Sequence, residues 1–465
     1  MTSLADLTAL ELGAAYASGE LSPVAVARSV FDRIERMEPM LNAMYRINVD
    51  AAMMAASASE ERWRSGKALG PLDGVPITIK ENIDTVGDPT PLGTAATVLV
   101  AKTRDAPPAA RVREAGCTIL GKTTMPDFGM LSAGRSSIHG TTHNPWDLSR
   151  NTSGSSSGAG AATAAGYGPL HLGTDIGGSV RLPAAHCGHF ALKPSLGRVP
   201  IDPPYMGRVT GPMTRTVTDA ALLMEALNRP DKRDWMALPW QPQAYVGKLQ
   251  SLPLKGLRIG MMTDVGAGLP VNPAVRAATE AAGAALESAG AIVEPVSGFL
   301  TAAMLDAICR FFEARSYNDV SAMTEETRNK VLPFIVQWCS HRARHFTGVE
   351  VMAAYTEVMA MRAAAVRHSA DVDFLISPCS PILPYSVDAH APGDDPENAL
   401  SHIAFTVPYS MSEQPAASIN WTHTAEGLPV GVQVIGERFN DLGVLQLSWW
   451  LEQLRGPQAP WPQPG

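Results

Sequence analysis

The segment from Asn151 to Pro194 constrains the fold more than any other part of this chain of 465 residues. It holds two serine clusters flanked by glycine, Ser153–Gly158 and Gly173–Arg181, with an alanine-rich run between them. A flexible linker repeats small residues without apolar interruption, whereas Ala159–Ala165 predicts a short, close-packed helix. Glycine beside serine also lets the backbone approach whatever the hydroxyl faces. The segment therefore indicates a packed site that carries serine hydroxyls.

Short strands and helices alternate on either side of this segment. Ile77–Lys80 has the alternation of a strand, with Lys80 at its end. Pro108–Glu114 predicts a helix that Gly116 stops, and Cys117–Leu120 predicts the next strand. Later strands are expected at Leu257–Met261, Ile292–Val293, Asp373–Ile376 and Val430–Ile435. This order is typical of an α/β protein, a mixed sheet with helices on both faces.

Helices dominate the remaining regions. Ser22 and Pro23 have the N-cap and first-turn pattern of a helix, and Asn272-Pro273 begins another that runs from Ala274 to Ala289. Two or more helices are expected between Thr301 and His368. Three segments are expected to line an apolar pocket: Met125–Met130, Ile201–Met206 and Phe311–Trp338.

Composition excludes several classes of function. The net charge is −8, the pI is about 5.8 and no basic cluster stands out, so nucleic acid is not expected as a partner. No apolar stretch approaches the roughly 18 residues of a membrane span, so no membrane partner is expected. A basic segment followed by an apolar one is missing at the start of the sequence, and a cytoplasmic location is therefore expected.

No metal or cofactor site is expected. The five cysteines show no C-x-x-C spacing and are interpreted as buried free thiols, with neither a zinc site nor a disulfide framework. No G-x-x-x-x-G-K-[ST] occurs, so no nucleotide site is expected. The histidines of the central region are assigned to packing or surface roles, because their spacing does not favour zinc: His139, His143, His171, His186 and His189.

Three motifs together resemble the amidase signature family. They are Lys80 within Gly74–Thr85, the serine run after Asn144–Asp147, and Gly173–Arg181 followed by Lys193-Pro194. The resemblance is dense from about Leu69 to Asp219, recurs weakly near Gly427–Gln433 and is absent from about Pro230 to Asp371.

The family resemblance implies one α/β/α sandwich domain over residues 1–465, with a mixed central sheet. Its expected parts are an N-terminal helical region (1–68), a catalytic core (69–229), a variable cap that forms the substrate pocket (230–370), the C-terminal part of the core (371–455) and a loose, proline-rich tail (456–465).

The family carries a Ser-Ser-Lys triad, and the resemblance implies one here. Ser179 matches the nucleophile and Lys80 the base. Alignment without gaps from Asn144-Pro145-Trp146 places the bridging serine at Ser155, which leaves Ser156 less favoured. The resemblance also implies a cis peptide bond between Gly154 and Ser155. Two serines, Ser153 and Ser157, stand where the family usually has glycine, and whether they alter the proton relay stays open.

The chemistry of such a triad follows from the residue types. A serine hydroxyl needs a base within hydrogen-bond reach, and a lysine with the ordinary pKa of about 10.4 is protonated at neutral pH. Burial among hydroxyls, without a carboxylate, would lower that pKa. Neutral Lys80 is then expected to take a proton through Ser155 from Ser179, which attacks the carbonyl carbon. Water then hydrolyses the acyl-enzyme.

Residues around Ser179 are expected to support this reaction. The backbone N–H groups of four residues form the expected oxyanion hole, since glycines let amides point at developing charge: Ile176, Gly177, Gly178 and Ser179. Asp175 and Arg181 are expected to brace the loop, and Thr174 and Ser153 to assist by hydrogen bonding.

The sequence thus predicts an amidase for a small hydrophobic or aryl amide, with a carbamate (urethane) or ester ranked second. Three alternatives remain. The chain could be a glutaminase-type subunit of a tRNA amidotransferase, or a binding module without catalysis. It could also be an α/β-hydrolase, because Gly154–Gly158 fits G-x-S-x-G with Ser156 as nucleophile, although Asn151–Ser153 is a poor strand for it. Oligomeric state cannot be read from the sequence.

Overall fold

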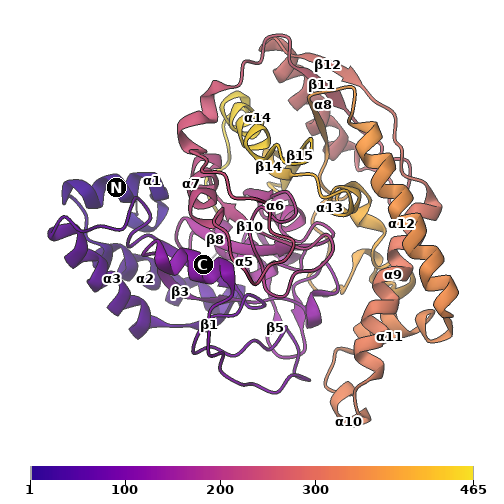
Figure 1. The fold of residues 1–465 in the computed structure, drawn as a ribbon, viewed down its shortest axis with the longest axis horizontal. Coiled ribbons are helices and arrows are strands. Elements are labelled where there is room, and N and C mark those ends of the chain that lie inside the picture. The colour runs from indigo at the N-terminus through magenta and orange to yellow at the C-terminus, as the bar shows by residue number, and fades with distance from the viewer. Residues whose placement is uncertain (1–2, 464–465) are drawn as a thin grey trace.

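A mixed sheet forms the centre of the protein in the computed structural model, which describes residues 3–463 (Figure 1). Within these residues the sheet has eleven strands in the order β1-β3-β2-β8-β10-β9-β14-β15-β13-β11-β12. Its strands are β1 (Met44–Ile47), β2 (Pro76–Lys80), β3 (Thr118–Thr123), β8 (Leu170–Asp175), β9 (Phe190–Lys193), β10 (Val209–Thr214), β11 (Arg258–Met261), β12 (Ile292–Pro295), β13 (Phe374–Pro378), β14 (Ala416–His423) and β15 (Pro429–Gly436). Two small ladders lie outside it: β4 (Arg135–Ser136) with β5 (Gly140–Thr141), and β6 (His143–Asn144) with β7 (Asp147–Asn151).

Helices surround the sheet (Figure 1). They are α1 (Ala9–Ser18), α2 (Pro23–Leu41), α3 (Val49–Arg64), α4 (Pro107–Glu114), α5 (Ser157–Ala165), α6 (Arg181–Cys187), α7 (Val217–Leu227), α8 (Pro273–Ser288), α9 (Ala302–Ser321), α10 (Glu325–Arg328), α11 (Pro333–Ser340), α12 (Gly348–His368), α13 (Val407–Met411) and α14 (Asp441–Leu454). The expected caps are present: the Ser22 hydroxyl accepts from Val24 N–H, and the Asn272 side chain accepts from Ala274 N–H.

Both faces of the sheet are covered by helices, as the alternation of side chains on β9 shows. Ala191 packs with residues of α5 and α6, whereas its neighbours Phe190 and Leu192 pack with α7 and α14. Successive side chains of a strand point to opposite faces. The α/β/α sandwich and the mixed sheet predicted from the sequence are therefore confirmed.

The region predicted as a cap divides into two parts. Within residues 230–370, β11, α8 and β12 extend the central sheet, with β11 parallel to β13 and β12. The helices α9, α11 and α12 pack on one another outside the sheet (Figure 1). Only residues from about 302 onward thus have the position of a cap, because the earlier part supplies strands that complete the sheet edge.

The C-terminal tail is more tightly held than the sequence predicted. The Gln458 side chain accepts a hydrogen bond from Asn420 Nδ2 (2.8 Å) and donates to the Trp421 carbonyl (3.2 Å). The centre of the Trp461 ring lies 4.3 Å from the Arg215 guanidinium carbon. These contacts fix residues 456–463 on the surface, whereas the rest of the predicted tail, 464–465, lies outside the described residues.

None of the helices in the described part of the chain combines the length and apolar character that crossing a membrane requires.

Candidate active site

Two neighbouring strands bring the predicted site residues together. Lys80 ends β2, and Thr174 and Asp175 end β8. Because β2 and β8 are parallel, their carboxyl ends meet at one edge of the sheet. Ser155 approaches this edge on the loop between β7 and α5, and Ser179 on the loop between β8 and α6.

Lys80 lies in the dry, hydroxyl-rich environment that the sequence predicted. Its side chain is fully buried, and its Nζ lies 2.9 Å from both Ser155 Oγ and Thr174 Oγ1. Within residues 3–463 no carboxylate lies within ion-pair distance of it. Burial lowers the pKa of Lys80 to about 7, although the more distant charges of Asp175 and Glu81 raise it in part. A substantial fraction of this amine is therefore neutral near pH 7.

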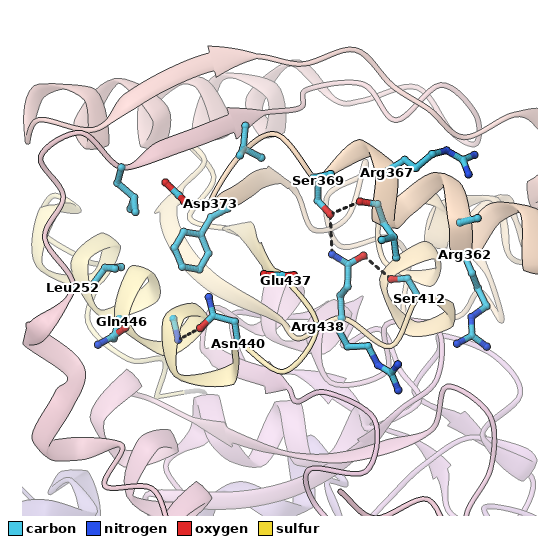
Figure 2. A pocket seen from close by; sticks show the side chains of 18 of the residues that line it. Leu252, Arg362, Arg367, Ser369, Asp373, Ser412, Glu437, Arg438, Asn440 and Gln446 are labelled. Atoms are coloured by element: carbon cyan, nitrogen blue, oxygen red, sulfur yellow. Dashed lines mark hydrogen bonds between the residues drawn. The ribbon is translucent and has the colours of Figure 1, made fainter. Parts of the chain in front are cut away.

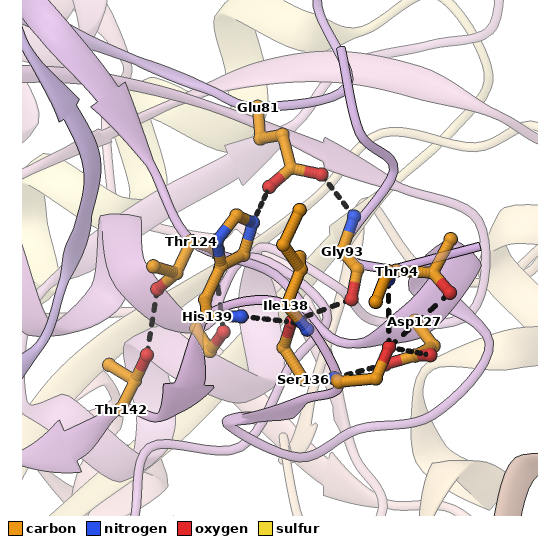
Figure 3. A network of polar contacts seen from close by, with 12 residues as sticks. Glu81, Gly93, Thr94, Thr124, Asp127, Ser136, Ile138, His139 and Thr142 are labelled. Carbon is orange, nitrogen blue, oxygen red and sulfur yellow. Dashed lines mark hydrogen bonds and ion pairs between the residues drawn. The ribbon is translucent and has the colours of Figure 1, made fainter. Parts of the chain in front are cut away.

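Glu81 is adjacent to Lys80 in sequence but is engaged elsewhere. Its carboxylate pairs with His139 Nε2 and accepts a hydrogen bond from Gly93 N–H (Figure 3). The same network ties Ser136 to the Gly93 carbonyl at 2.6 Å. These contacts hold the carboxylate out of ion-pair range of the lysine, which preserves the low pKa of its amine.

Ser155 and Ser179 line one cavity of about 270 Å³. The two loops that carry them are joined, because Ser156 N–H donates to the Ser179 carbonyl at 3.1 Å. The peptide bond between Gly154 and Ser155 is cis, as predicted. The cavity is thus open to both serines, and the amine of Lys80 lies within hydrogen-bond distance of Ser155.

Asp175 and Arg181 form a buried ion pair behind the Ser179 loop. Arg181 Nη2 lies 2.9 Å from Asp175 Oδ1, and both side chains are fully buried. Burial alone would raise the pKa of Asp175, but the charge and hydrogen bonds of Arg181 lower it to about 2. Arg181 also donates to the Thr406 carbonyl (3.0 Å) and to Gln433 Oε1 (2.8 Å). This arrangement fits the bracing role assigned to the pair.

The predicted oxyanion hole differs from the structure at Gly178. The Gly178 N–H donates to Asp175 Oδ1 at 2.8 Å and is therefore occupied. Within residues 3–463 the amides of Ile176, Gly177 and Ser179 have no acceptor, and these residues line the cavities around Ser179. Three of the four predicted amides remain available to an oxyanion.

The other serines of the first cluster are structural. Ser156 is fully buried, and its hydroxyl bonds both the Thr174 carbonyl (3.2 Å) and the Thr174 N–H (3.3 Å). It therefore lacks the exposure that a nucleophile elbow requires. The Ser153 hydroxyl has no hydrogen-bond partner among residues 3–463, contrary to the assisting role predicted for it. Ser157 begins α5, and its hydroxyl lies 3.5 Å from the Thr124 carbonyl.

Two of the histidines assigned to packing roles hydrogen-bond to neighbouring hydroxyls. His171 contacts the Thr78 hydroxyl (2.7 Å), and His186 contacts the Ser380 hydroxyl (3.1 Å). Within the described residues no three His, Cys, Asp or Glu side chains gather as metal ligands would. All five thiols are free; four are buried, and Cys309 is half-buried.

Several residues around the site were not predicted. Asn82 donates to Thr174 Oγ1 at 3.0 Å and lines the cavity of Ser179. It lies in the turn that follows β2, closed by the hydrogen bond from Ile83 N–H to the Lys80 carbonyl at 3.0 Å, so strand alternation could not have revealed it. Four more residues line that cavity without any motif to mark them: Tyr205, Arg208, Arg315 and Asp319.

An apolar cavity adjoins Ser179 on the side of the α9–α11 helices. It takes residues from two of the three segments predicted to line a pocket, together with the loop before α13. Its apolar lining comprises Met130, Leu131, Ile176, Phe312, Trp338, Leu400 and Ile403. The third predicted segment, Ile201–Met206, contributes Tyr205 to the polar cavity instead. Phe311 and Phe334 line neither cavity.

A larger cavity, of about 990 Å³, lies between α12, β13 and α14 (Figure 2). It contains none of the predicted site residues. Internal hydrogen bonds cross its wall, with Gln414 Nε2 donating to Ser369 Oγ at 3.0 Å and Ser412 Oγ donating to Gln414 Oε1 at 2.8 Å. Two of its arginines, Arg362 and Arg438, pair with Glu413. The candidate active site is therefore placed at Lys80, Ser155 and Ser179.

The chain belongs to the amidase family, whose profile, described as Amidase, matches residues 25–445. This confirms the resemblance drawn from the three motifs. Membership makes the protein an amidohydrolase, an enzyme that cleaves linear amides with water.

Particular relatives cover almost the whole chain. It is 34% identical to a glutamyl-tRNA(Gln) amidotransferase subunit of Symbiobacterium thermophilum, over 95% of this chain and 96% of the relative. It is 33% identical to an acylamidase of Rhodococcus erythropolis, over 98% of this chain and 96% of the relative. Among solved structures, a bacterial aryl acylamidase of the amidase signature enzymes superposes with a TM-score of 0.89 at 28% identity, covering 96% of each chain. A 6-aminohexanoate cyclic dimer hydrolase superposes with a TM-score of 0.85 at 27% identity, covering 98% of each.

Proposed function

We propose that this amidohydrolase cleaves a small amide with a hydrophobic or aryl group through an acyl-enzyme on Ser179. The observation that carries the proposal is the buried amine of Lys80, which lies 2.9 Å from Ser155 Oγ and has a pKa of about 7. A base with a pKa near the working pH combines the right protonation state with a useful driving force for proton transfer.

Each proposed step has a group that can perform it. Neutral Lys80 accepts a proton from Ser155, which in turn accepts one from Ser179 as its oxygen attacks the amide carbon. The unoccupied amides of Ile176, Gly177 and Ser179 stabilise the oxyanion. The relay then runs in reverse and protonates the leaving nitrogen, and a water molecule attacks the acyl carbon to release the acid.

The apolar cavity beside Ser179 has a volume of about 40 Å³, and its lining supports a small hydrophobic substrate group. Phe312 and Trp338 of the cap helices line it together with Leu400 and Ile403. The similarity to an acylamidase and to an aryl acylamidase points in the same direction. Carbamates and esters present the same carbonyl carbon to Ser179 and remain secondary candidates.

A glutaminase-type component of an amidotransferase is the second candidate function. It is favoured by the 34% identity to the glutamyl-tRNA(Gln) amidotransferase relative over nearly the full length of both chains. In that case the site would release ammonia from glutamine inside a complex. Stable co-purification with other proteins and a preference for glutamine over anilides would support this candidate.

The test compares the wild type with Ser179→Ala on a panel of neutral 4-nitroanilides, 4-nitrophenyl carbamates and 4-nitrophenyl esters, with glutamine added as a separate substrate. We expect anilide hydrolysis by the wild type and a loss of about a thousandfold or more in the variant. Ser156→Ala is the matched control, since it removes a buried neighbouring hydroxyl. Mass spectrometry of the wild type quenched during turnover should find the acyl group on Ser179. Activity retained by Ser179→Ala would end the proposal.

A further inference from the structure

Two arginines stand beside the proposed nucleophile without an acidic partner. Arg208 and Arg315 line the same polar cavity as Ser179 and Ser155. Arg315 also lines the apolar cavity, so it lies where the two meet. Within residues 3–463 neither guanidinium has a carboxylate within ion-pair distance, whereas most arginines of the chain do.

Their existing contacts leave most of their hydrogen-bonding capacity free. Both guanidiniums lie over the ring of Tyr205, with Cζ 5.9 Å from the ring centre for Arg208 and 5.0 Å for Arg315. Arg208 donates to the Pro203 carbonyl, and Arg315 donates no hydrogen bond to the described chain. A guanidinium carries five N–H donors, so most donors of the two cavity-lining arginines have no acceptor within the described chain.

Nearby acids do not neutralise the pair. Asp202 pairs with Arg104 (3.1 Å), and Asp84 pairs with Lys102 (3.2 Å). Asp234 accepts backbone hydrogen bonds from Ile201 and Met236. Asp319 lines the same cavity and accepts from Asn318.

Burial and repulsion by Arg315 make the positive charge of Arg208 costly. Burial, followed by the charge of Arg315, lowers the pKa of Arg208 below its ordinary value. Among residues 3–463, Asp319 in the cavity lining and Asp234 near Arg208 are carboxylates without a cationic partner, and neither lies within ion-pair distance of the two guanidiniums, which therefore stay free to pair with an anion. Such an arrangement is stabilised when an anion enters, because arginine binds carboxylates through charge-assisted, often bidentate hydrogen bonds.

We propose that Arg208 and Arg315 bind a carboxylate of the substrate, so that the preferred amide carries an anionic group on one side of the scissile bond and an apolar group on the other. This inference rests on the proposed function, because it places the scissile carbonyl at Ser179 between the two cavities. An N-acylated amino acid and the monoamide of a dicarboxylic acid both have this chemistry.

The test uses pairs of substrates that differ only in the charge. On the leaving-group side, N-hexanoyl-4-aminobenzoate is compared with neutral N-hexanoyl-4-aminobenzamide. On the acyl side, the monoanilide of glutaric acid is compared with its methyl-ketone isostere. We expect kcat/KM to favour the carboxylate by about tenfold to a hundredfold in one of the two series, the range of a charge-assisted hydrogen bond. The ratio should fall as salt is added.

Variants then assign the preference to the arginines. Arg315→Gln and Arg208→Gln should each bring the ratio of carboxylate to neutral substrate toward one, and Arg315→Glu should reverse it in favour of an ammonium-bearing analogue. Arg438→Gln is the matched control, because Arg438 pairs with Glu413 in the separate cavity of Figure 2.

Each outcome separates this inference from the proposed function. If the wild type hydrolyses both members of each pair at equal rates, the carboxylate site is wrong and the amidase proposal stands. If it hydrolyses neither member of any pair but cleaves the neutral 4-nitroanilides, only the carboxylate site is overturned; if it cleaves none of these amides, both are overturned. Should a variant fail to fold, the wild type is inhibited with free 4-hydroxybenzoate and, separately, with 4-hydroxybenzamide. Stronger inhibition by the benzoate would support the carboxylate site, and equal inhibition would overturn it, because only an anion site would distinguish the two compounds.

Discussion

Two lysines lie fully buried at the ends of sheet strands, and their surroundings differ in one decisive respect. Lys80 ends β2 and Lys193 ends β9, and burial lowers the pKa of each to about 7. The Lys80 amine contacts the hydroxyls of Ser155 and Thr174. The Lys193 amine contacts only the carbonyl of Pro194 within the described chain, at 3.0 Å.

Burial of a lysine does not by itself make it a base. Both amines can lose a proton near neutral pH, but a carbonyl oxygen has no proton to give to Lys193, whereas the Ser155 hydroxyl has one to give to Lys80. The neighbouring charges differ as well, because Arg181 lowers the pKa of Lys193 further. A lowered pKa marks a candidate base, and the identity of the contacting atom decides between candidates.

The strongest test replaces each lysine with methionine, which keeps the length and removes the amine. Lys80→Met should lose about a thousandfold or more of kcat/KM, because the relay loses its proton acceptor. Lys193→Met should lose less than about tenfold. Steady-state kinetics on a neutral anilide, with circular dichroism to verify folding, measures both. Equal losses in the two variants would remove the distinction drawn between the two sites.

The pH dependence sharpens the same comparison. Below the pKa of Lys80, about 7, kcat/KM should rise about tenfold per pH unit as the amine loses its proton, and above it the rate should level off. Lys193→Met should show the same midpoint. Initial rates on an uncharged anilide from pH 5 to 9 provide the profile. A rate that does not change with pH between 5 and 7 would exclude Lys80 as the base.

A smaller effect is expected on the pH dependence of stability. Between about pH 7 and 10.4 the unfolded chain keeps a proton on Lys193 that the folded chain has lost, so the free energy of unfolding should rise with pH. Compared with Lys193→Met, the wild type should gain up to about 1.4 kcal/mol per pH unit in this range. Urea unfolding of both proteins at pH 7 and pH 9 measures the difference. An equal change in the two proteins would mean that Lys193 keeps its proton when folded.

Much of the fold followed from local signals in the sequence. The alternation that ends at Lys80 predicted β2, and Ser22-Pro23 predicted the start of α2, because both signals act within a few residues. The Ser179 loop was located for the same reason, since its glycines and its neighbours Asp175 and Arg181 lie together in the chain.

Contacts between distant segments could not be predicted in this way. Arg315 reaches the Ser179 cavity from α9, a region without any motif, and only the packing of the cap helices brings it there. The capture of the Gly178 amide by Asp175 depends on the path of a loop, not on residue type. Ser153 has a φ of 61°, which composition does not reveal, and its hydroxyl is left without a partner in the described chain.

Arg215 joins the two extremities of the described chain. Its guanidinium pairs with Asp6 at 2.7 Å and also lies under the ring of Trp461. The first and last described segments are therefore held against the same guanidinium, so replacing this one side chain would loosen both at once.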